Sequence, residues 1–465
     1  MYYLAVDIGA SSGRHMLGCI HNGKLELEEV YRFSNGMIKK NGQLCWDTER
    51  LFQEILNGLK ACAKIGKVPT YMGIDTWAVD FVLLDQDDQM LGDTVGYRDH
   101  RTEGMGKYVY EQIPLLELYE RTGIQKLPFN TVYQLMAVKT QAPTTLADAK
   151  SLLMIPEYFN FLLTGVKKAE YTNATSTQLV NVGSKDWDDE LIRLLGYPRE
   201  IFQAISKPGT FVGMFTEQIA NEVGFACEVL LPATHDTASA VVAVPSNAED
   251  TLYLSSGTWS LMGVERMDPD TSAASMAYNF SHEGGYDDRY RYLKNIMGLW
   301  MIQELKRELG DAYSFAELCE LAAESEISSL VDCQDQRFLA PKSMIAEVQG
   351  YCAENGMPTP ESPGELAAVI YNSLAACYAK TVDELETMTG KTYEAIHIIG
   401  GGANADYLNE ITAVRTKKDV YAGPTEATAI GNLTVQMLVT GVFANLQEAR
   451  KCIYESFEIR HYKGE

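Results

Sequence analysis

The sequence lacks the signals that mark secreted, membrane-spanning and disulfide-rich proteins. Its 465 residues contain no apolar run of about 18 residues, the length that a transmembrane helix needs. The opening segment, Met1–Ala10, has no basic stretch ahead of an apolar one and no small-residue cleavage site, so we expect no signal peptide. The nine cysteines are scattered and form no Cys-x-x-Cys pair, which argues against a zinc site or a disulfide framework. We therefore expect reduced thiols and a cytoplasmic protein.

Positive charge is also scarce. Lys and Arg total 39 against 63 Asp and Glu, which gives a formal net charge of −24. A nucleic-acid-binding protein needs a basic face, so this class is excluded, and an anionic substrate needs local cations or a metal ion to be held. The hydrophobic fraction of 46% and the charged fraction of 22% are those of an ordinary folded protein. The length predicts two to four domains.

The N-terminal segment is predicted to form a β-hairpin whose first strand is followed by a turn of small residues. Residues 4–8 and 16–20 are short, largely apolar runs typical of covered strands, and they flank the turn at 9–13. Asn22-Gly23 is a strong signal for a tight hairpin turn, and a third strand follows at 24–30. Apolar residues at helical spacing then predict a helix over 51–62.

The same plan of strand, Ser/Gly turn and strand recurs at 252–264. The repeat suggests that the chain consists of two related halves. Residues 245–250 are polar and contain proline, so we place a boundary there, which gives domains 1–244 and 245–465. Near the C-terminus, Ser362-Pro363-Gly364-Glu365 is a capping box that begins a long helix.

Three small-residue or acidic turns are candidate sites. A turn such as 9–14 exposes backbone N–H groups that bind phosphate oxygens, and Asp7 beside it is suited to a hydrated Mg²⁺; a plain hairpin turn with a solvated Asp7 is the alternative. The turn at 255–258 has the same composition and is either an ordinary turn or a second phosphate-binding hairpin. Asp236 lies at a strand-to-helix junction, where amide donors lower the pKa of a carboxyl group and keep it ionised. This suits a base that takes a hydroxyl proton, although a simple helix cap is the alternative.

Gly400-Gly401-Gly402-Ala403-Asn404-Ala405 satisfies G-x-G-x-x-A after a predicted strand, with Asp419 about twenty residues on, which is the fingerprint of a dinucleotide-binding fold. No clean βαβαβ series surrounds it, and Asp419 precedes its strand where the ribose-binding acid should follow one. We therefore interpret the glycines as allowing close approach of the backbone to the ribose or adenine of a nucleotide. Close helix packing is the alternative.

Weaker candidates lie near other strands. Trp77 and Asp80 are suited to a polyol pocket, where aromatic faces stack on C–H surfaces and carboxylates accept hydroxyl protons. Asn295 and Gln303 bracket an apolar segment, 296–302, which we expect to be a helix that places an amide at a cleft.

Together these motifs resemble the FGGY carbohydrate kinases, in the superfamily of actin, hexokinase and Hsp70. The resemblance covers about residues 3–445 and rests on Val6–Arg14, Leu254–Ser260 and Ile399–Asn404. It implies an α/β fold of two duplicated RNase H-like, actin-like domains with a nucleotide and sugar cleft between them. Within the family, the blocks 73–81, 97–99, 234–240 and 289–300 are similar to those of members that phosphorylate the ketose L-rhamnulose.

The resemblance also implies roles for individual residues. Asp236 is the expected proton acceptor, and Asp7 is the expected contact of the Mg²⁺ that accompanies ATP. The expected sugar-binding residues are Trp77, Ala78, Asp80, His235 and Asn295. The expected ATP-binding residues are Ala10, Ser11, Ser12, Gly13, Arg14, Thr258, Gln303, Gly401 and Gly402. Ala78 departs from the pattern, because the members acting on L-rhamnulose carry a glycine there whose backbone touches the sugar.

We therefore expect an ATP- and Mg²⁺-dependent kinase that phosphorylates L-rhamnulose at O1, with no nucleic-acid or membrane partner. Three alternatives remain at this point: a kinase for another ketose such as L-fuculose or L-xylulose, a nicotinamide-dependent dehydrogenase built on 400–405, and an ATP-binding sensor without turnover.

Overall fold

The computed structural model describes residues 1–248 and 250–464. The chain forms two compact units. The first unit comprises Met1–Ala243, Glu265–Tyr292 and Thr428–Ser456, and the second comprises Val244–Val264, Leu293–Ala427 and Phe457–Glu465. The first unit thus takes in two segments that follow the division expected at residue 244. Glu249, inside the expected boundary, and Glu465 lie outside the described residues.

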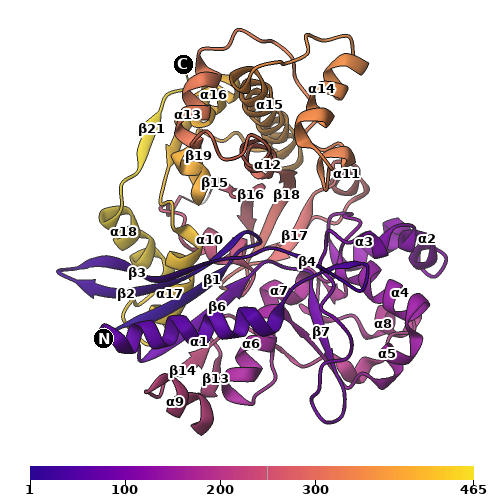
Figure 1. Cartoon of the computed structure of the whole chain (residues 1–465), viewed down its shortest axis with the longest axis vertical. Helices are drawn as coiled ribbons and strands as arrows, with labels where there is room; N and C mark the ends of the chain where they lie inside the picture. The colour runs from indigo at the N-terminus through magenta and orange to yellow at the C-terminus, as the bar shows by residue number, and fades with distance from the viewer. Residues whose placement is uncertain (249, 465) are drawn as a thin grey trace. The chain divides into compact units, whose positions relative to one another are not determined.

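The first unit is built on a six-stranded sheet in the order β13-β14-β6-β1-β2-β3 (Figure 1). Its strands are β1 (Tyr3–Ile8), β2 (Ser12–His21), β3 (Lys24–Ser34), β6 (Tyr71–Thr76), β13 (Phe211–Met214) and β14 (Glu228–Leu230). Strand β1 pairs antiparallel with β2 and parallel with β6, and β6 pairs parallel with β14. The turn between β2 and β3 has positive φ at Asn22 (52°) and Gly23 (77°), which confirms the predicted hairpin.

Helices cover both faces of this sheet. Helix α1 (Thr48–Lys64) packs on the face that carries His15, because a Cβ added at Gly58 would lie 2.3 Å from the His15 ring. Helix α17 (Ala427–Val439) packs on the opposite face, where a Cβ added at Gly18 would lie 2.6 Å from Leu433. Successive strand residues point to opposite faces, so β1 between two helices is buried at all six positions.

The rest of the first unit consists of short helices and strands, many of which pack around an apolar core formed by residues between 81 and 205. Its helices are α2 (Met105–Tyr110), α3 (Leu115–Thr122), α4 (Thr131–Gln141), α5 (Pro143–Asp148), α6 (Ile155–Thr164), α7 (Tyr171–Thr175), α8 (Asp189–Leu194), α9 (Glu217–Val223), α10 (Asp236–Val242), α11 (Ala273–Ala277) and α18 (Leu446–Ser456). Its remaining strands are β4 (Ile38–Lys40), β5 (Gln43–Cys45), β7 (Phe81–Leu84), β8 (Ser151–Met154), β9 (Ala169–Glu170), β10 (Val180–Asn181), β11 (Asp186–Trp187), β12 (Ile205–Ser206) and β17 (Ser281–Gly284).

The second unit repeats the plan of the first. Its strands β15 (Leu252–Ser256), β16 (Trp259–Arg266), β18 (Tyr290–Met297), β19 (Ala395–Ile399), β20 (Asp419–Ala422) and β21 (Arg460–Tyr462) lie in the order β18-β16-β15-β19-β20-β21. Strand β15 pairs antiparallel with β16 and parallel with β19, as β1 does with β2 and β6. The repeat of strand, turn and strand predicted from the sequence is therefore a repeat of topology.

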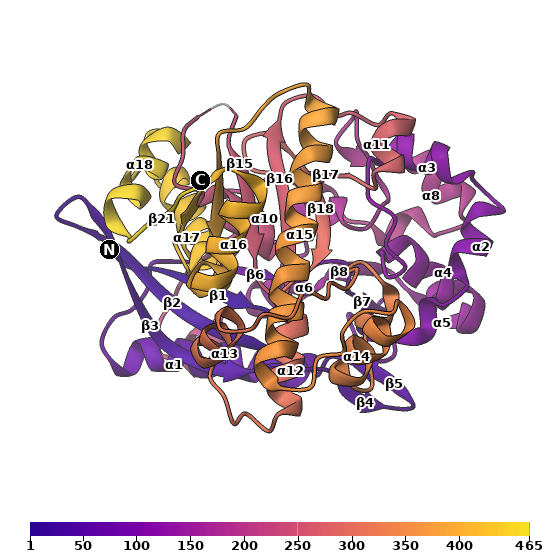
Figure 2. The same cartoon turned by 90° about the horizontal axis from the view of Figure 1, so that it is seen from above.

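Among its described residues, the second unit also contains the α-helices α12 (Trp300–Glu308), α13 (Phe315–Ala323), α14 (Met344–Glu354), α15 (Pro363–Thr389) and α16 (Asp406–Thr416). The capping box predicted for α15 is present, because Ser362 Oγ accepts from the Glu365 amide at 3.2 Å and Glu365 Oε2 accepts from the Ser362 amide at 3.0 Å. Helix α15, the long orange helix in Figure 2, packs against α13 and α16.

The prediction of a helix over residues 296–302 is wrong. Residues 290–297 form strand β18, and α12 begins only at Trp300. Seven of the eight residues of β18 are buried, so the strand lacks the alternation that would have revealed it. Gly298 separates the two elements, and a Cβ added there would lie 2.6 Å from the Ser260 amide nitrogen.

All nine cysteines are free thiols, which agrees with the reduced state expected from their spacing. Among the described residues, no helix combines the length and the apolar character needed to cross a membrane.

Candidate active site

Three carboxylates of the first unit gather at the carboxyl ends of its parallel strands. Asp7 on β1 and Asp75 on β6 are register partners, so their side chains point to the same face. Thr76 forms a parallel bridge to His235 in the segment after β14, and this places Asp236 at the same edge. The carboxyl ends of parallel strands are the usual location of ligand sites in α/β folds.

Asp236 is the first residue of α10 and its side chain is 25% exposed. Its Oδ1 accepts from the Thr237 amide at 2.6 Å. Burial, followed by repulsion from Asp7, raises the pKa of Asp236 to about 7. The expectation that helix amides lower this pKa is therefore wrong, because desolvation and a like charge outweigh one amide donor. The group is poised to exchange a proton near neutral pH.

Asp75 is buried and carries an oxygen without a donor. Its Oδ2 accepts from Asn432 Nδ2 at 2.6 Å, whereas its Oδ1 has no hydrogen-bond partner among the described residues. Burial and the neighbouring Asp7 raise the pKa of Asp75 well above its usual value. Asp7 in turn accepts from Arg14 Nε at 3.0 Å.

These oxygens fit a hydrated Mg²⁺. A hard cation prefers a few carboxylates and several waters, and it would satisfy the unpartnered Oδ1 of Asp75 beside Asp7. The described residues contain no group of three or more His, Cys, Asp and Glu arranged to hold a metal by themselves. A cation here would therefore keep ligands from water or phosphate.

The first small-residue turn is held by Asn35. Asn35 donates from its side-chain Nδ2 to the Gly9 carbonyl at 2.8 Å and from its backbone N–H to the Ser11 carbonyl at 2.9 Å. Of the predicted ATP-binding residues, Ser11 is exposed, whereas Ala10, Ser12 and Arg14 are half-buried. Gly13 is buried, and a Cβ added there would lie 2.1 Å from the Phe33 ring. The close contact with the Phe33 ring is thus sufficient to explain why position 13 has no room for a side chain.

His235, predicted to bind the sugar, is buried against an arginine. Arg291 has no exposed side-chain surface and donates to His235 Nδ1 at 3.1 Å, to Thr237 Oγ1 at 3.0 Å and to Glu283 Oε2 at 3.0 Å. Burial and the Arg291 charge lower the pKa of His235 well below its usual value, so the imidazole is neutral.

Glu170 fixes the segment that precedes Asp236. Its Oε2 accepts from the Thr234 amide at 3.1 Å, from Thr234 Oγ1 at 2.8 Å and from Thr172 Oγ1 at 2.6 Å. Thr172 Oγ1 also accepts from the His235 amide at 3.3 Å. No sequence motif pointed to a role for Glu170, Glu283 or Arg291 at this site, since they lie far from residues 234–237 along the chain.

Asp80 organises the aromatic residues near the predicted sugar site. It is fully buried, and its Oδ2 accepts from Trp46 Nε1 at 2.6 Å and from Trp77 Nε1 at 3.0 Å. Burial raises the pKa of Asp80 to about 6. Ala78 is half-buried between Trp77 and Val79, and Val79 adopts a φ of +66°, which is strained for a β-branched residue. Strain of this kind is often retained at functional sites.

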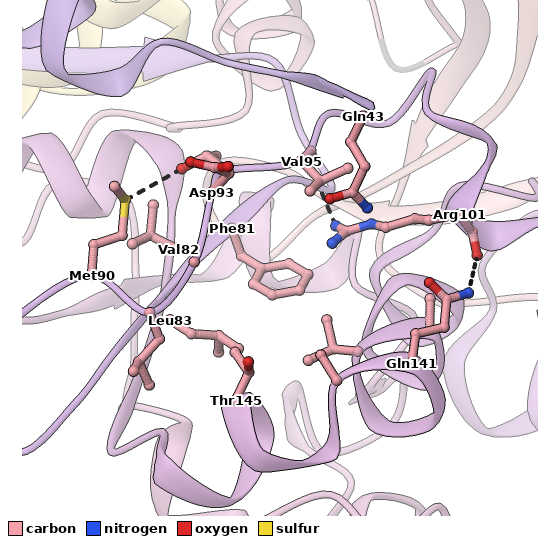
Figure 3. Close-up of a pocket in the computed structure, with 16 residues that line it drawn as sticks. Gln43, Phe81, Val82, Leu83, Met90, Asp93, Val95, Arg101, Gln141 and Thr145 are labelled. Atoms are coloured by element: carbon pink, nitrogen blue, oxygen red, sulfur yellow. Dashed lines mark hydrogen bonds between the residues drawn. The ribbon is translucent and has the colours of Figure 1, made fainter. Parts of the chain in front are cut away.

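A cavity of about 260 Å³ in the first unit is lined in part by Phe81, the residue that follows Asp80 (Figure 3). Its lining includes none of the predicted site residues. Arg101, one of the lining residues, donates to Gln134 Oε1 at 2.5 Å, and Gln134 Nε2 donates to Asp80 Oδ1 at 2.9 Å. The cavity is thus connected to Asp80 through two hydrogen bonds.

In the second unit, the structure brings together two predicted ATP-binding segments and packs α12 against one of them. The Trp300 amide donates to the Thr258 carbonyl at 3.1 Å, which docks the start of α12, the helix of Gln303, on the 255–258 turn. Gly402 is buried against the same turn, where an added Cβ would lie 1.9 Å from Ser256 Oγ. Gly401 is exposed with open space around its Cα. Asn295 is half-buried on β18.

The comparisons with known proteins agree with the sequence motifs. The model of the N-terminal domain of the FGGY family of carbohydrate kinases matches residues 2–243, and the model of its C-terminal domain matches residues 252–439. The chain belongs to the FGGY family of carbohydrate kinases. The dehydrogenase alternative is thereby set aside, since the Gly400–Ala405 motif is part of an FGGY domain and enters a short 3₁₀ turn, Gly401–Asn404.

Curated FGGY relatives resemble the chain over nearly its full length. A protein of Halalkalibacterium halodurans named rhamnulokinase is 54% identical over 462 residues, which covers 99% of this chain and 98% of that protein. A Bacillus subtilis protein of the same name is 42% identical over 462 residues, with 99% and 95% covered.

Solved structures establish the fold. A xylulose kinase from Lactobacillus acidophilus gives a TM-score of 0.80 at 16% identity, covering 99% of this chain and 93% of that one. A Plasmodium falciparum glycerol kinase with ADP gives a TM-score of 0.76 at 15% identity, with 99% and 94% covered. The predicted α/β fold of two related actin-like domains is therefore confirmed.

Proposed function

We propose that the chain transfers the γ-phosphoryl group of ATP to O1 of L-rhamnulose, giving L-rhamnulose 1-phosphate and ADP. The names of the relatives at 42–54% identity support this substrate. The observation that carries the chemistry is Asp236, a partly exposed carboxylate at the carboxyl edge of the sheet with a pKa of about 7. A group with this pKa accepts a hydroxyl proton at neutral pH at little cost.

In the proposed reaction, Asp236 takes the proton of the O1 hydroxyl as O1 bonds to the γ-phosphorus. The bond between the γ-phosphorus and the bridging oxygen breaks, and ADP leaves with that electron pair. Positioning and electrostatic stabilisation dominate such transfers, so amides and hydroxyls around the phosphates supply most of the remaining catalysis.

We assign the phosphate contacts to the turn residues Ala10, Ser11, Ser12 and Arg14, and to Thr258. The amides of Ala10 and Ser11 have no acceptor in the described part of the chain, which supports a phosphate-binding turn. Gly13 and Gly402 would contribute by shaping these turns through their contacts with Phe33 and Ser256. Gly401, which is exposed, and Gln303 are proposed to contact the nucleotide directly.

We assign sugar contacts to Trp77, Ala78, His235 and Asn295. Asp80 is proposed to act by orienting the Trp77 ring, since its Oδ2 already accepts two indole N–H groups. Asp7 would hold Mg²⁺, with the orphaned oxygen of Asp75 beside it. When bound, the ion supplies positive charge to the β- and γ-phosphates. Asp7 would orient the ion, and Arg14 would balance the Asp7 charge before nucleotide arrives.

We further propose that the chain is a cytoplasmic enzyme without nucleic-acid or membrane partners. We also propose that its two sequence domains span residues 1–244 and 245–465.

A second candidate substrate has one observation in its favour. The methyl group of Ala78 narrows the expected pocket, which would favour a smaller ketose such as L-xylulose.

A coupled assay of ADP release over L-rhamnulose, L-fuculose and L-xylulose tests the proposal. We expect the highest kcat/KM with L-rhamnulose. We also expect the Ala78→Gly variant to rank the three ketoses in the same order as the wild type. A higher kcat/KM for another ketose would reassign the substrate, and ATP binding without sugar-dependent turnover would leave only the sensor alternative.

A further inference from the structure

The imidazole of His235 is in contact with a group that can only donate hydrogen bonds. Arg291 Nη2 lies 3.1 Å from His235 Nδ1. A guanidinium has five N–H donors and no acceptor, so this contact is a hydrogen bond only if Nδ1 carries a lone pair. The proton of the neutral ring must then reside on Nε2.

We propose that Arg291 is a positioning residue that fixes His235 in the Nε2–H tautomer, so that the ring presents a donor to an oxygen of the substrate. This inference rests on the proposed function for the identity of the substrate, but the tautomer itself does not depend on it. Arg291 would act only through His235 and Thr237.

Glu283 and the surrounding backbone hold Arg291 in the required orientation. The guanidinium donates from Nε to the Gly284 carbonyl at 2.9 Å and from Nη2 to Glu283 Oε2 at 3.0 Å, and both side chains are buried. A planar guanidinium held at two points cannot rotate away from Nδ1. Glu283 also balances the charge of Arg291, which removes the cost of burying an unpaired cation.

The other nitrogen of His235 faces the reactive end of the site. Nε2 lies 3.1 Å from Thr237 Oγ1 and 3.6 Å from Asp236 Oδ1. Thr237 Oγ1 also accepts from Arg291 Nη1 at 3.0 Å. With the proton on Nε2, the imidazole donates to Thr237 in the structure. A sugar oxygen that approaches Asp236 would replace Thr237 as the acceptor of this N–H.

The charged groups around the ring favour the neutral form. Asp236 and Glu283 are the acidic neighbours, at 3.6 Å and 3.5 Å, and Arg291 is the basic one, at 3.1 Å. Burial and Arg291 lower the pKa of His235 well below its usual value in spite of the two carboxylates. His235 is thus a fixed donor at neutral pH and does not take part in proton transfer.

Nitrogen-15 NMR of the full-length protein with labelled histidine tests the tautomer directly, because the ring nitrogen shifts distinguish protonated from unprotonated positions. The His235 signals are assigned from the spectrum of His235→Gln. We expect the neutral Nε2–H form to persist from about pH 6 to pH 8. A ring protonated on Nδ1, or an imidazolium at about pH 7, would overturn the proposal.

An Arg291→Met variant should release the constraint, so that His235 populates both tautomers. Arg450→Met is the matched control, since Arg450 is also buried and donates to a glutamate, Glu265, at 2.7 Å. We expect the control to lose stability without changing the His235 signals. An unaltered His235 tautomer in folded Arg291→Met would refute the role of Arg291.

Should Arg291→Met fail to fold, two substitutions of His235 provide the second readout. Gln reaches the position of Nε2 with an amide donor, whereas Asn places its amide near Nδ1. With a ketose that turns over, we expect His235→Gln to stay within a few-fold of the wild-type KM and His235→Asn to raise it about tenfold. Equal KM values would contradict an Nε2 donor. A wild-type protein without ketose turnover would instead refute the proposed function and leave the NMR result standing.

Discussion

Asn432 Nδ2 donates to Asp75 Oδ2 at 2.6 Å, although 357 positions separate these two residues in the chain. The same nitrogen donates to the Gly73 carbonyl at 3.1 Å. Helix α17 near the C-terminus thus holds the end of β6, the strand that carries one of the three clustered carboxylates. Both side chains are buried, so the contact supplies a donor to a carboxylate oxygen that lies away from water.

Removing this contact should destabilise the first unit. We expect Asn432→Ala to lower the free energy of unfolding by about 1–3 kcal/mol, since a buried carboxylate oxygen loses its donor. Asn57→Ala, which removes an exposed amide bonded to Glu54, is the control and should change stability little. Urea denaturation measures the free energy of unfolding of both variants. Equal losses of stability in the two variants would contradict a stabilising role for the contact between Asn432 and Asp75.

Replacing Asp236 should abolish most of the activity without unfolding the protein. We expect Asp236→Asn to lower kcat by about 10²- to 10⁴-fold, the range for loss of a general base. Asp148→Asn, an exposed carboxylate at the end of α5, serves as the control. The coupled ADP assay measures both variants, and a near-normal kcat in Asp236→Asn would assign the base elsewhere.

The activity of the unmodified enzyme should rise through neutral pH. Asp236 must be deprotonated to accept a proton, and its pKa is raised to about 7 by burial and by Asp7. We therefore expect log kcat/KM to increase with pH and to level off above about pH 7. A profile that stays flat from about pH 5 to pH 8 would be inconsistent with a base whose pKa is raised in this way.

Stability should fall over part of the same pH range. Glu157 on α6 accepts from the Met154 and Glu170 amides, and burial raises its pKa to about 8. Between about pH 4.5 and pH 8 the folded state keeps a proton that the unfolded chain has lost, so stability decreases as pH rises. We expect the Tm of Glu157→Gln to fall less over this range than that of the wild type. Glu120→Gln, at an exposed position, should follow the wild type.

Gly401 and Gly402, two of the three glycines at 400–402, should respond differently to alanine. An alanine Cβ at position 402 would lie 1.9 Å from Ser256 Oγ, whereas position 401 has open space around it. We expect Gly402→Ala to lower the Tm and the affinity for ATP together, and Gly401→Ala to keep the Tm. Adding Ser256→Gly to Gly402→Ala should restore part of the Tm. Calorimetry with and without ATP measures both effects, and an absence of rescue would mean that the clash lies elsewhere.

Much of the fold was readable from local patterns. The Asn22-Gly23 turn, the capping box of Ser362 and the strand that precedes Gly400 all appear where the sequence predicted them. Such features depend on neighbours within a few residues, and propensity and periodicity report them directly. The helix predicted over 296–302 is wrong because a sequence-based prediction depends on a local periodic pattern. A strand that is buried on both faces carries no such pattern.

Contiguous motifs were enough to reveal the two turns of small residues, the acidic residue at the head of α10 and the family that contains them. The protonation chemistry around Asp236 follows instead from how distant segments of the chain pack together. The raised pKa of that carboxyl group depends on its burial and on Asp7, and the tautomer of His235 depends on Arg291. Electrostatic energies act through space across strands far apart in the chain, so no local pattern records them.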